Sequence, residues 1–388
     1  MKIALCAWEA VYAIEIGGVS AHVFGLAAAL AAAGHETHLF TRQGDGQNAT
    51  DLINGVHYHR CPWRARGDLF GEVAAFAETA RFYLQNTAAL IDGFDVLHCH
   101  DWLTFALGAR WQKEQGGKFI ATFHTTEWGR SGAWPERGDG LKIAETELAA
   151  TRDADGVIVV SQEISRQVKL LYHCPDWKTR LIHYGIDCLP PARHALLRQA
   201  TRAKYKLPEN APTCLFVGSL NERKGADILI EKLPEILPQV AGGKFIFAGH
   251  GALLGRLREI IDHNAATETV LTLTDYSAGE LAALYYAADV VAIPYRYDPF
   301  GAVALAAWEA ARPVAVCGDG ATAELTFNEV NGIKTTPENF GAALVNLLNH
   351  PEHGKWLGMN GRAAAETAFS WQTIAERALA LYKASSGQ

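Results

Sequence analysis

Short apolar runs alternate with longer helical patterns from one end of this chain to the other. In the first half, the runs predict strands at Lys2–Ala7, Thr37–Thr41, Val56–Arg60, Val96–Cys99, Lys118–Phe123, Val157–Val160 and Arg180–His183. The stretches between them predict helices that include Ser20–Ala33, Asp68–Leu90, Leu103–Gln115, Leu141–Arg152 and Gln162–Leu171. Strands that alternate with helices predict parallel sheets joined by crossover helices, so the expected fold class is α/β.

One proline-containing segment interrupts this alternation of strands and helices. It contains Pro190-Pro191, a basic helical stretch, Pro208 and Pro212, which is a composition typical of a domain boundary. After it, strands are predicted at Thr213–Val217, Phe245–Ala248, Val270–Leu273, Val290–Ile293 and Pro313–Val316, with helices to the end of the chain. We therefore expect two doubly wound, Rossmann-like domains that face each other across a ligand-binding cleft at the carboxyl ends of their strands.

The composition narrows the class of protein further. The 388 residues carry 35 Lys+Arg against 42 Asp+Glu, a formal charge of −7, and 49% are hydrophobic. A soluble globular protein is expected, and the absence of a strong basic run disfavours a nucleic-acid partner. No stretch of about 20 uninterrupted apolar residues predicts a transmembrane segment. Glu9 and Glu15 interrupt the first apolar run, which disfavours a signal peptide.

The seven cysteines are spread along the chain without a CxxC pair. This spacing favours reduced thiols in a cytoplasmic protein and indicates neither a disulfide framework nor a zinc site.

Two motifs in the first half could bind ligand. Gly17-Gly18, between the first strand and the first helix, would let a phosphate approach the helix N-terminus, although a tight connection alone also explains the pair. The second motif, Asp95 to Trp102, places His98 and His100 on one side of a strand. Metal ligation is disfavoured because no further ligand cluster is evident, so His100 and Asp101 are interpreted as polar cleft groups or a helix cap.

A third motif directly follows the predicted strand Lys118–Phe123. It brings His124, Glu127 and Arg130 within seven residues. A carboxylate accepts hydrogen bonds from sugar hydroxyls and a guanidinium binds anions, so this combination predicts a sugar or phosphate site. Among the tryptophans, we expect Trp128 to lie near a bound sugar and Trp8 to pack in a core or interface.

Two further motifs lie in the second half. Arg223 and Lys224 follow Gly218 at the start of a helix. We interpret this arrangement as a diphosphate-binding site in preference to a solvated basic turn. Gly249-His-Gly251, at the end of the next strand, is expected at the same edge of the sheet. Asp298-Pro-Phe-Gly301 ends a strand and begins a helix, so Asp298 would face the cleft beside free backbone N–H groups, as a helix cap, a ligand contact or both.

These motifs occur in an order that resembles the retaining glycosyltransferases of family 4. They are GGVSAHVFGL, DVLHCHDWLT, TFHTTEWGR, ADGVIVVS, HYGID, VGSLNERKG, FAGHG and RYDPFGAVAL. The His-Asp-Trp and Thr-Phe-His-Thr-Thr-Glu segments are most similar to glycogen and starch synthases, particularly the archaeal type. The resemblance implies the GT-B architecture: an acceptor-side domain over residues 1–190, a donor domain over 191–368, and a last segment, 369–388, whose helix crosses back to the first domain.

The same resemblance implies an activity: a hexose, presumed to be glucose, moves from UDP- or ADP-glucose to a glycan acceptor with retention of configuration. Neither metal nor cofactor is expected, because the nucleotide sugar is a substrate. The implied catalytic residues are His124, Lys224 and Asp298. The implied donor-binding residues are Gly17, Gly18, Arg223, Gly249, Gly251, Phe300, Gly301, Ala302 and Glu309. The implied acceptor or sugar ligands are His100, Asp101, Glu127, Trp128 and Arg130.

Three positions depart from the family pattern. Asp298 and Ala306 stand where the family usually has two Glu residues eight apart, the second of which commonly contacts the ribose. Ser219 stands where a diphosphate-binding Arg is usual. Arg223 and Glu309 are the expected replacements. The departures leave two alternatives open: a glycosyltransferase with a small-molecule or lipid-linked acceptor, and a degenerate, non-catalytic glycan-binding protein.

Overall fold

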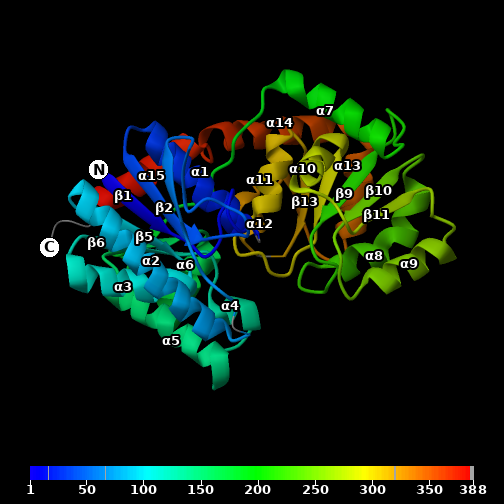
Figure 1. The fold of residues 1–388 in the computed structure, drawn as a ribbon. Helices are drawn as coiled ribbons and strands as arrows, with labels where there is room; N and C mark the ends of the chain where they lie inside the picture. Colours follow the sequence, from blue (N-terminus) through cyan, green and yellow to red (C-terminus); the bar gives the residue numbers. More distant parts are fainter. Residues whose placement is uncertain (16, 66, 319, 385–388) are drawn as a thin grey trace. The chain divides into compact units, whose positions relative to one another are not determined.

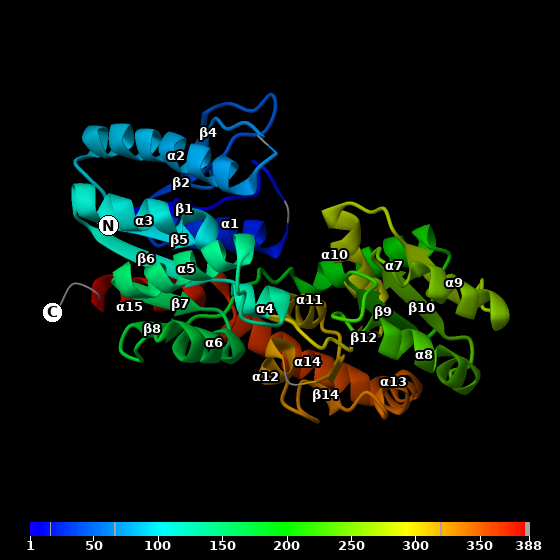
Figure 2. The same cartoon turned by 90° about the horizontal axis from the view of Figure 1, so that it is seen from below.

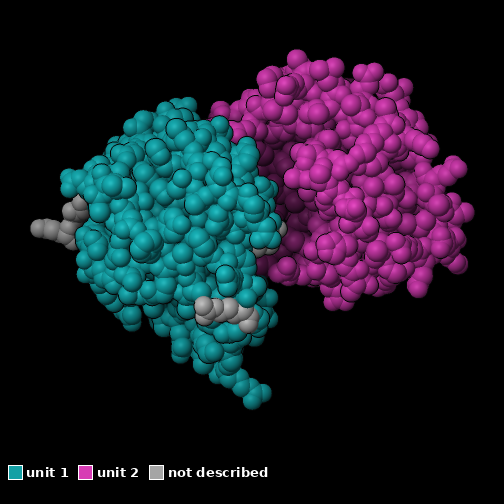
Figure 3. Space-filling model, viewed as in Figure 1, with its two compact units in different colours: residues 1–185, 371–388 teal, residues 186–370 magenta. Residues whose placement is uncertain are grey.

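The chain folds into two compact units in a computed structural model that describes residues 1–15, 17–65, 67–318 and 320–384. Unit 1 comprises Met1–Gly185 and Trp371–Gln388, and unit 2 comprises Ile186–Ser370 (Figure 3). Of the segment 369–388 expected to return to the first domain, residues 385–388 lie outside the described part.

Unit 1 is built on an eight-stranded sheet with the order β3-β4-β2-β1-β5-β6-β7-β8 (Figure 1). Its strands are β1 Lys2–Cys6, β2 Glu36–Arg42, β3 Thr50–Ile53, β4 Val56–Cys61, β5 Val96–His100, β6 Lys118–Phe123, β7 Gly156–Val159 and β8 Thr179–Leu181. Its helices are α1 Gly18–Ala32, α2 Leu69–Ile91, α3 Trp102–Gln115, α4 Glu127–Ser131, α5 Gly138–Asp153, α6 Gln162–Tyr172 and α15 Trp371–Ala384.

Helices cover both faces of this sheet. Helices α1 and α15 pack together on one face, over a core that includes Ile3, Leu5 and Ile120, while α2, α3 and α5 cover the other (Figures 1 and 2). The indole of Trp371 fills a notch over Gly25 and Gly185, where an added Cβ would lie 2.2 and 2.4 Å from the ring. The close packing of the Trp371 ring on these two glycines, together with apolar contacts, therefore fixes α15 in unit 1.

Unit 2 is built on a six-stranded, wholly parallel sheet with the order β11-β10-β9-β12-β13-β14. Its strands are β9 Thr213–Val217, β10 Lys244–Ala248, β11 Val270–Leu273, β12 Val290–Ile293, β13 Val314–Cys317 and β14 Gly332–Thr335. Its helices are α7 Pro191–Lys204, α8 Ala226–Ile236, α9 Leu254–His263, α10 Ala278–Ala287, α11 Ala302–Glu309, α12 Ala321–Leu325, α13 Phe340–Asn349 and α14 Pro351–Thr367, with a 3₁₀ turn, η1 Leu237–Gln239.

The predicted α/β class with two parallel-sheet domains is confirmed. Two strands were not predicted. One is β14, the edge strand that pairs with β13 in unit 2, and the other is β3, which is antiparallel to β4 in unit 1. Asn54 and Gly55 join β3 to β4 with φ of 50° and 78°, as a two-residue hairpin turn requires. Within the described residues, no helix combines the length and apolar character needed to cross a membrane.

The strand orders locate the ligand-binding edge of each sheet. In unit 1 the order reverses between β1 and β5, and in unit 2 between β9 and β12. Open parallel sheets bind ligands outside the carboxyl ends of the strands at such reversals. The five motifs from the sequence all follow strands at or beside these two points.

Candidate active site

Lys224 and Asp298 meet at the strand-order reversal of unit 2. The Lys224 ammonium lies 3.6 Å from Oδ1 of Asp298 and 4.1 Å from the centre of the Tyr295 ring. Thr322 donates a hydrogen bond of 2.5 Å to the other Asp298 oxygen. Burial lowers the pKa of Lys224, an effect that Asp298 opposes and Arg223 reinforces. The structure therefore holds a poorly hydrated cation beside one carboxylate.

Close backbone approaches build the rim beside Lys224. The loop after β9 packs against the loop after β10. The backbone N–H groups of Gly218 and Leu220 donate to the carbonyls of Ala248 and His250, each at 2.9 Å. A Cβ on Gly249 would lie 1.9 Å from the Gly218 carbonyl oxygen, and one on Gly251 would lie 2.5 Å from that of Leu220. Both glycines are needed for this close loop packing.

The start of α11 lies directly after Asp298. Gly301 is the N-cap, with φ of 93° and no side-chain cap, and Ala302 is the exposed first residue of the helix. Phe300 is buried beneath it. Asp298 does not cap this helix, so the amides of its first turn are not capped by a side chain and can meet an anion.

Glu309 is committed to other contacts within unit 2. One carboxylate oxygen accepts from the Leu189 backbone N–H at 2.8 Å and lies 3.5 Å from Arg362, and the other accepts from the Tyr286 hydroxyl. These bonds support a structural role for Glu309, and its expected contact with the nucleotide ribose stays a prediction. Ala306, one turn earlier, offers no polar group in its place.

Arg223 and Ser219 are both exposed on the loop before α8. The Arg223 carbonyl accepts from the backbone N–H groups of Arg296 and Tyr297 at 3.1 and 3.2 Å. These bonds fix the loop that carries Lys224, and residue Arg223 is exposed. The expected substitution of Arg223 for the missing Arg stays a prediction.

In unit 1, the glycine pair precedes α1 as predicted, but a carboxylate lies at the helix N-terminus. Gly17 is the N-cap of α1, and Glu9 accepts hydrogen bonds from Gly17 and Ser20. Burial raises the pKa of Glu9, while these bonds and Arg42 lower it. The protein thus places a side chain of its own at this helix N-terminus, where backbone N–H groups can donate to its oxygens.

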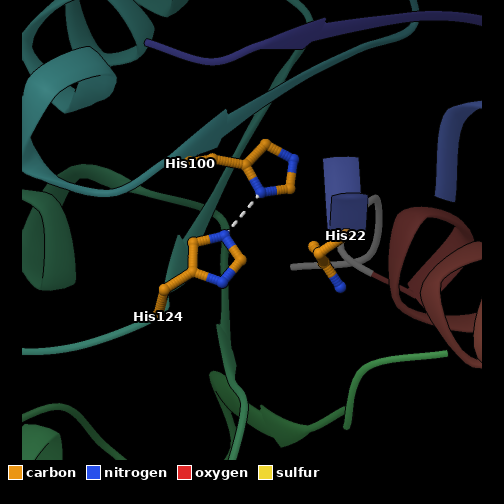
Figure 4. Close-up of side chains that lie close together, drawn as sticks. All are labelled: His22, His100 and His124. Carbon is orange, nitrogen blue, oxygen red and sulfur yellow. Dashed lines mark hydrogen bonds between the residues drawn. The ribbon is translucent and has the colours of Figure 1, made fainter. Parts of the chain in front are cut away.

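Three buried histidines converge beside this helix (Figure 4). His22 comes from α1, His100 from the end of β5 and His124 from the residue after β6. Nδ1 of His100 lies 3.0 Å from Nε2 of His124, and the Tyr184 hydroxyl lies 2.6 Å from Nδ1 of His124. Both ring nitrogens of His124 thus have partners, whereas Nδ1 of His22 and Nε2 of His100 have none among the described residues.

Burial keeps these imidazoles neutral. It lowers the pKa of His22 to about 3 and shifts the pKa values of His100 and His124 well below the ordinary range, with the neighbouring histidines adding to the effect. One ligand nitrogen from each ring lies within 4.8 Å of the others. Neutral imidazoles are suitable ligands for zinc and related metals, although the two facing nitrogens of His100 and His124 share a hydrogen bond that a metal would have to replace.

Asp101 connects the histidines to the sheet. Its carboxylate accepts from the backbone N–H of His124 at 2.9 Å, and its backbone has φ of 60°. Burial raises the pKa of Asp101 to about 7, opposed by Arg130. A partly buried acid with a raised pKa, on a residue with a left-handed φ at a sheet edge, is typical of functional sites.

Glu127 and Arg130 lie on α4, whose N-cap is Thr126. The Arg130 guanidinium donates to Glu127 at 3.0 Å and to the buried Glu147 at 2.7 Å. Trp128, between them, is half-buried. The structure therefore groups His100, Asp101, His124, Glu127 and Arg130 at one edge of unit 1.

Several participating residues were missed by sequence reasoning. They are Glu9, His22, Glu147, Tyr184, Tyr295 and Thr322. Two of them had a usable signal: Tyr184 follows β8 at the ligand-binding edge, and Thr322 lies just beyond β13. His22 is a polar residue in an otherwise apolar helix.

Comparison with known proteins decides the family. Residues 16–188 match Glycosyltransferase Family 4, and residues 211–350 match Glycosyl transferases group 1. The chain is 30% identical to an uncharacterized glycosyltransferase of Methanocaldococcus jannaschii, over 99% of this chain and 98% of that one. It belongs to the family 4 glycosyltransferases.

Two further likenesses concern a glycogen synthase and a starch synthase. It is 26% identical to a glycogen synthase of Mycobacterium tuberculosis, over 99% of its own length and 95% of the relative's. Its fold matches the catalytic domain of starch synthase IV from Arabidopsis thaliana, bound to ADP and acarbose, with a TM-score of 0.78, 18% identity and 99% of each chain covered. The predicted GT-B architecture is confirmed.

Proposed function

We propose that this glycosyltransferase moves glucose from UDP- or ADP-glucose to a glycan acceptor, with retention of configuration and without a metal. The observation that carries the proposal is the Lys224–Asp298 pair beside the uncapped start of α11. It supplies a desolvated cation and backbone amides for a diphosphate and a carboxylate for sugar hydroxyls.

The chemical roles follow from these groups. When the bond between sugar and diphosphate breaks, negative charge develops on the leaving diphosphate. A fixed, poorly hydrated Lys224 and the amides of Gly301 and Ala302 stabilise that charge more strongly than water would. Asp298 accepts hydrogen bonds from the hydroxyls of the transferred sugar.

Unit 1 supplies the acceptor side in this proposal. His124 is the group that contacts the transferred sugar, and its neutral imidazole can exchange a hydrogen bond with His100 for one with a hydroxyl. Asp101, Glu127 and Arg130 border the acceptor. Gly17 and Gly18, at the N-terminus of α1, are assigned to the donor, next to its diphosphate and the transferred sugar.

A transfer assay tests the proposal. The protein is incubated separately with UDP-glucose and ADP-glucose plus maltooligosaccharides, and nucleotide release and chain extension are followed by mass spectrometry. We expect an extended chain whose new linkage has the anomeric configuration of the donor. Neither transfer nor nucleotide release with either donor would contradict the proposal, and glycan binding without nucleotide binding would support the non-catalytic alternative.

A further inference from the structure

A group of large apolar side chains is exposed on unit 2, where α14 and the loop before β14 lie side by side (Figure 2). The loop contributes Phe327 and Val330, and the helix contributes Trp356 and Met359; each is 49–67% exposed. Asn360 donates a hydrogen bond of 2.8 Å to the Val330 carbonyl and so joins the helix to the loop. We call these four residues the α14 patch. Single exposed apolar residues are usual, whereas a contiguous group marks an interaction site.

The packing of α14 fixes which of its faces is exposed. Its opposite face carries buried glycines, among them Gly358 and Gly361. A Cβ on Gly358 would lie 2.2 Å from the Ala311 carbonyl oxygen, and one on Gly361 would lie 2.1 Å from the Trp308 ring. Because larger residues do not fit against these neighbours, the helix cannot rotate to bury the apolar side chains of the patch.

The loop of the patch is held as firmly as the helix. The Asn331 side chain accepts from the Phe327 backbone N–H at 2.7 Å, and the Asn331 carbonyl accepts from the buried Trp308 indole at 2.9 Å. Asn328 accepts from the Lys334 backbone N–H at 2.7 Å. Side chains on a fixed backbone lose less conformational entropy when a partner covers them, and Trp, Phe and Met are enriched in protein interfaces. The patch is therefore suited to a protein partner.

The exposed face of α14 is complementary to itself in size. Its residues follow at steps of three and four and so form one stripe along the helix: Glu352, Trp356, Met359, Ala363 and Glu366. In an antiparallel pair of α14 helices, with a two-fold axis between Met359 and Asn360, the large Trp356 of each copy lies opposite the small Ala363 of the other.

The same pairing is complementary in charge. Lys355 is exposed on one side of the stripe, and Glu366 is exposed on the same side towards the other end of the helix. The two-fold axis therefore brings Lys355 of one copy near Glu366 of the other at two symmetric places. Glu366 also accepts from Arg362 of its own helix at 2.6 Å, yet 47% of its side chain is exposed.

We propose that the α14 patch is an interface between two copies of this chain, with antiparallel α14 helices at its centre. A second copy fits better than a different protein or a glycan, because one helix carries both halves of each match, Trp356 with Ala363 and Lys355 with Glu366. Phe327 and Val330 extend the contact beside the helix pair. The proposal does not depend on the proposed transferase function.

Sedimentation velocity over a range of protein concentrations measures the oligomeric state. We expect a reversible dimer, with twice the mass of one chain, in the absence of sugars and nucleotides. A monomer at every concentration up to the solubility limit would overturn the proposal.

A substitution at the symmetry axis links the dimer to the patch. Met359→Lys should weaken dimerisation at least about tenfold, since it brings two like charges together at the axis. Leu170→Lys, at a leucine that is 67% exposed on α6 of unit 1, is the matched control and should leave the dimer unchanged. Circular dichroism verifies that both variants are folded. A Met359→Lys dimer as stable as that of the parent would refute the assignment.

Charge reversal tests the antiparallel pairing itself. Lys355→Glu should weaken the dimer several-fold because it places two acidic side chains opposite each other, and adding Glu366→Lys should restore it. Glu366→Lys also removes the bond to Arg362, so thermal unfolding of each variant is measured in parallel. A folded double variant that dimerises no better than Lys355→Glu alone would contradict the proposed arrangement of the helices.

Discussion

The hydroxyl of Tyr184 lies 2.6 Å from Nδ1 of His124 and holds the imidazole by the nitrogen farther from His100. This contact links the segment after β8 to the residue after β6, so the two side chains connect the ends of two strands. Because the other ring nitrogen faces His100, Tyr184 fixes the orientation of the His124 ring between two partners.

Tyr184→Phe should therefore slow transfer about tenfold while leaving donor binding nearly unchanged. The lost hydrogen bond leaves a buried nitrogen without a partner, which costs about 1–3 kcal/mol and loosens the ring. Steady-state kinetics across pH measure kcat and KM separately. Tyr12→Phe, at a half-exposed tyrosine of unit 1, is the matched control. An unaltered kcat and pH profile would remove Tyr184 from the site.

Asp298→Asn should reduce kcat/KM for the nucleotide sugar on the order of 10²-fold, because the neutral amide neither pairs with Lys224 nor accepts as strongly from sugar hydroxyls. Affinity for the free nucleoside diphosphate should change much less, since that ligand lacks the transferred hexose whose hydroxyls Asp298 contacts. Initial-rate kinetics measure kcat/KM, and nucleotide titration measures the affinity for the nucleoside diphosphate. Asp275→Asn, at an exposed position, is the control. An equal loss in kcat/KM and in nucleoside diphosphate affinity would contradict the sugar-binding role of Asp298.

Acid should destabilise unit 1 through its buried histidines. Burial lowers the pKa values of His22 and His98 to about 3, so below about pH 6.5 the unfolded chain binds protons that the folded chain does not. Each such group reduces the free energy of unfolding by up to about 1.4 kcal/mol per pH unit as pH falls from 6.5 towards 3. Asp101 acts oppositely, because its raised pKa makes the folded chain bind a proton between about pH 4 and 7.

Urea unfolding at pH 7 and pH 5 measures this effect. Stability should fall on acidification, and His22→Asn should show a shallower fall than the parent, whatever its absolute stability. A parallel pH dependence in the two proteins would show that His22 does not titrate on unfolding.

Removal of divalent metals should leave transfer unchanged. Lys224 and backbone amides supply the positive charge in the proposed mechanism, so treatment with EDTA and assay in metal-free buffer should give the untreated rate. If EDTA instead lowers the rate, zinc restores it, and His22→Asn removes this response to zinc, then the His22–His100–His124 cluster is a metal centre.

The order of apolar and polar residues was enough to predict the two parallel sheets and most of their strands. The hairpin of β3 was missed although Asn54-Gly55 is a strong turn signal, because a four-residue edge strand carries little periodicity. The motif residues after β5, β6, β9 and β12 lie at the predicted edges because the carboxyl ends of parallel strands share one edge.

Contacts between distant segments could not be predicted in the same way. The resemblance implies a ribose contact for Glu309, which stays a prediction, but nothing in the local sequence indicates its bonds to Leu189 and Tyr286. Likewise, His22 and Tyr184 meet His124 only because α1 and the segment after β8 approach the same sheet edge. Such proximity depends on loop paths that the local pattern does not encode.

Nucleotide binding by Lys224 tests the central claim most directly. UDP and ADP are titrated calorimetrically into the parent protein, Lys224→Ala and the control Lys232→Ala, a lysine that pairs with Glu235 on α8. We expect at least one nucleotide to bind the parent and the control alike and to bind Lys224→Ala at least about tenfold more weakly, as the loss of a charge-assisted contact implies. Absence of binding to the parent, or equal binding to all three proteins, would contradict the claim that unit 2 holds the diphosphate of a sugar donor at Lys224.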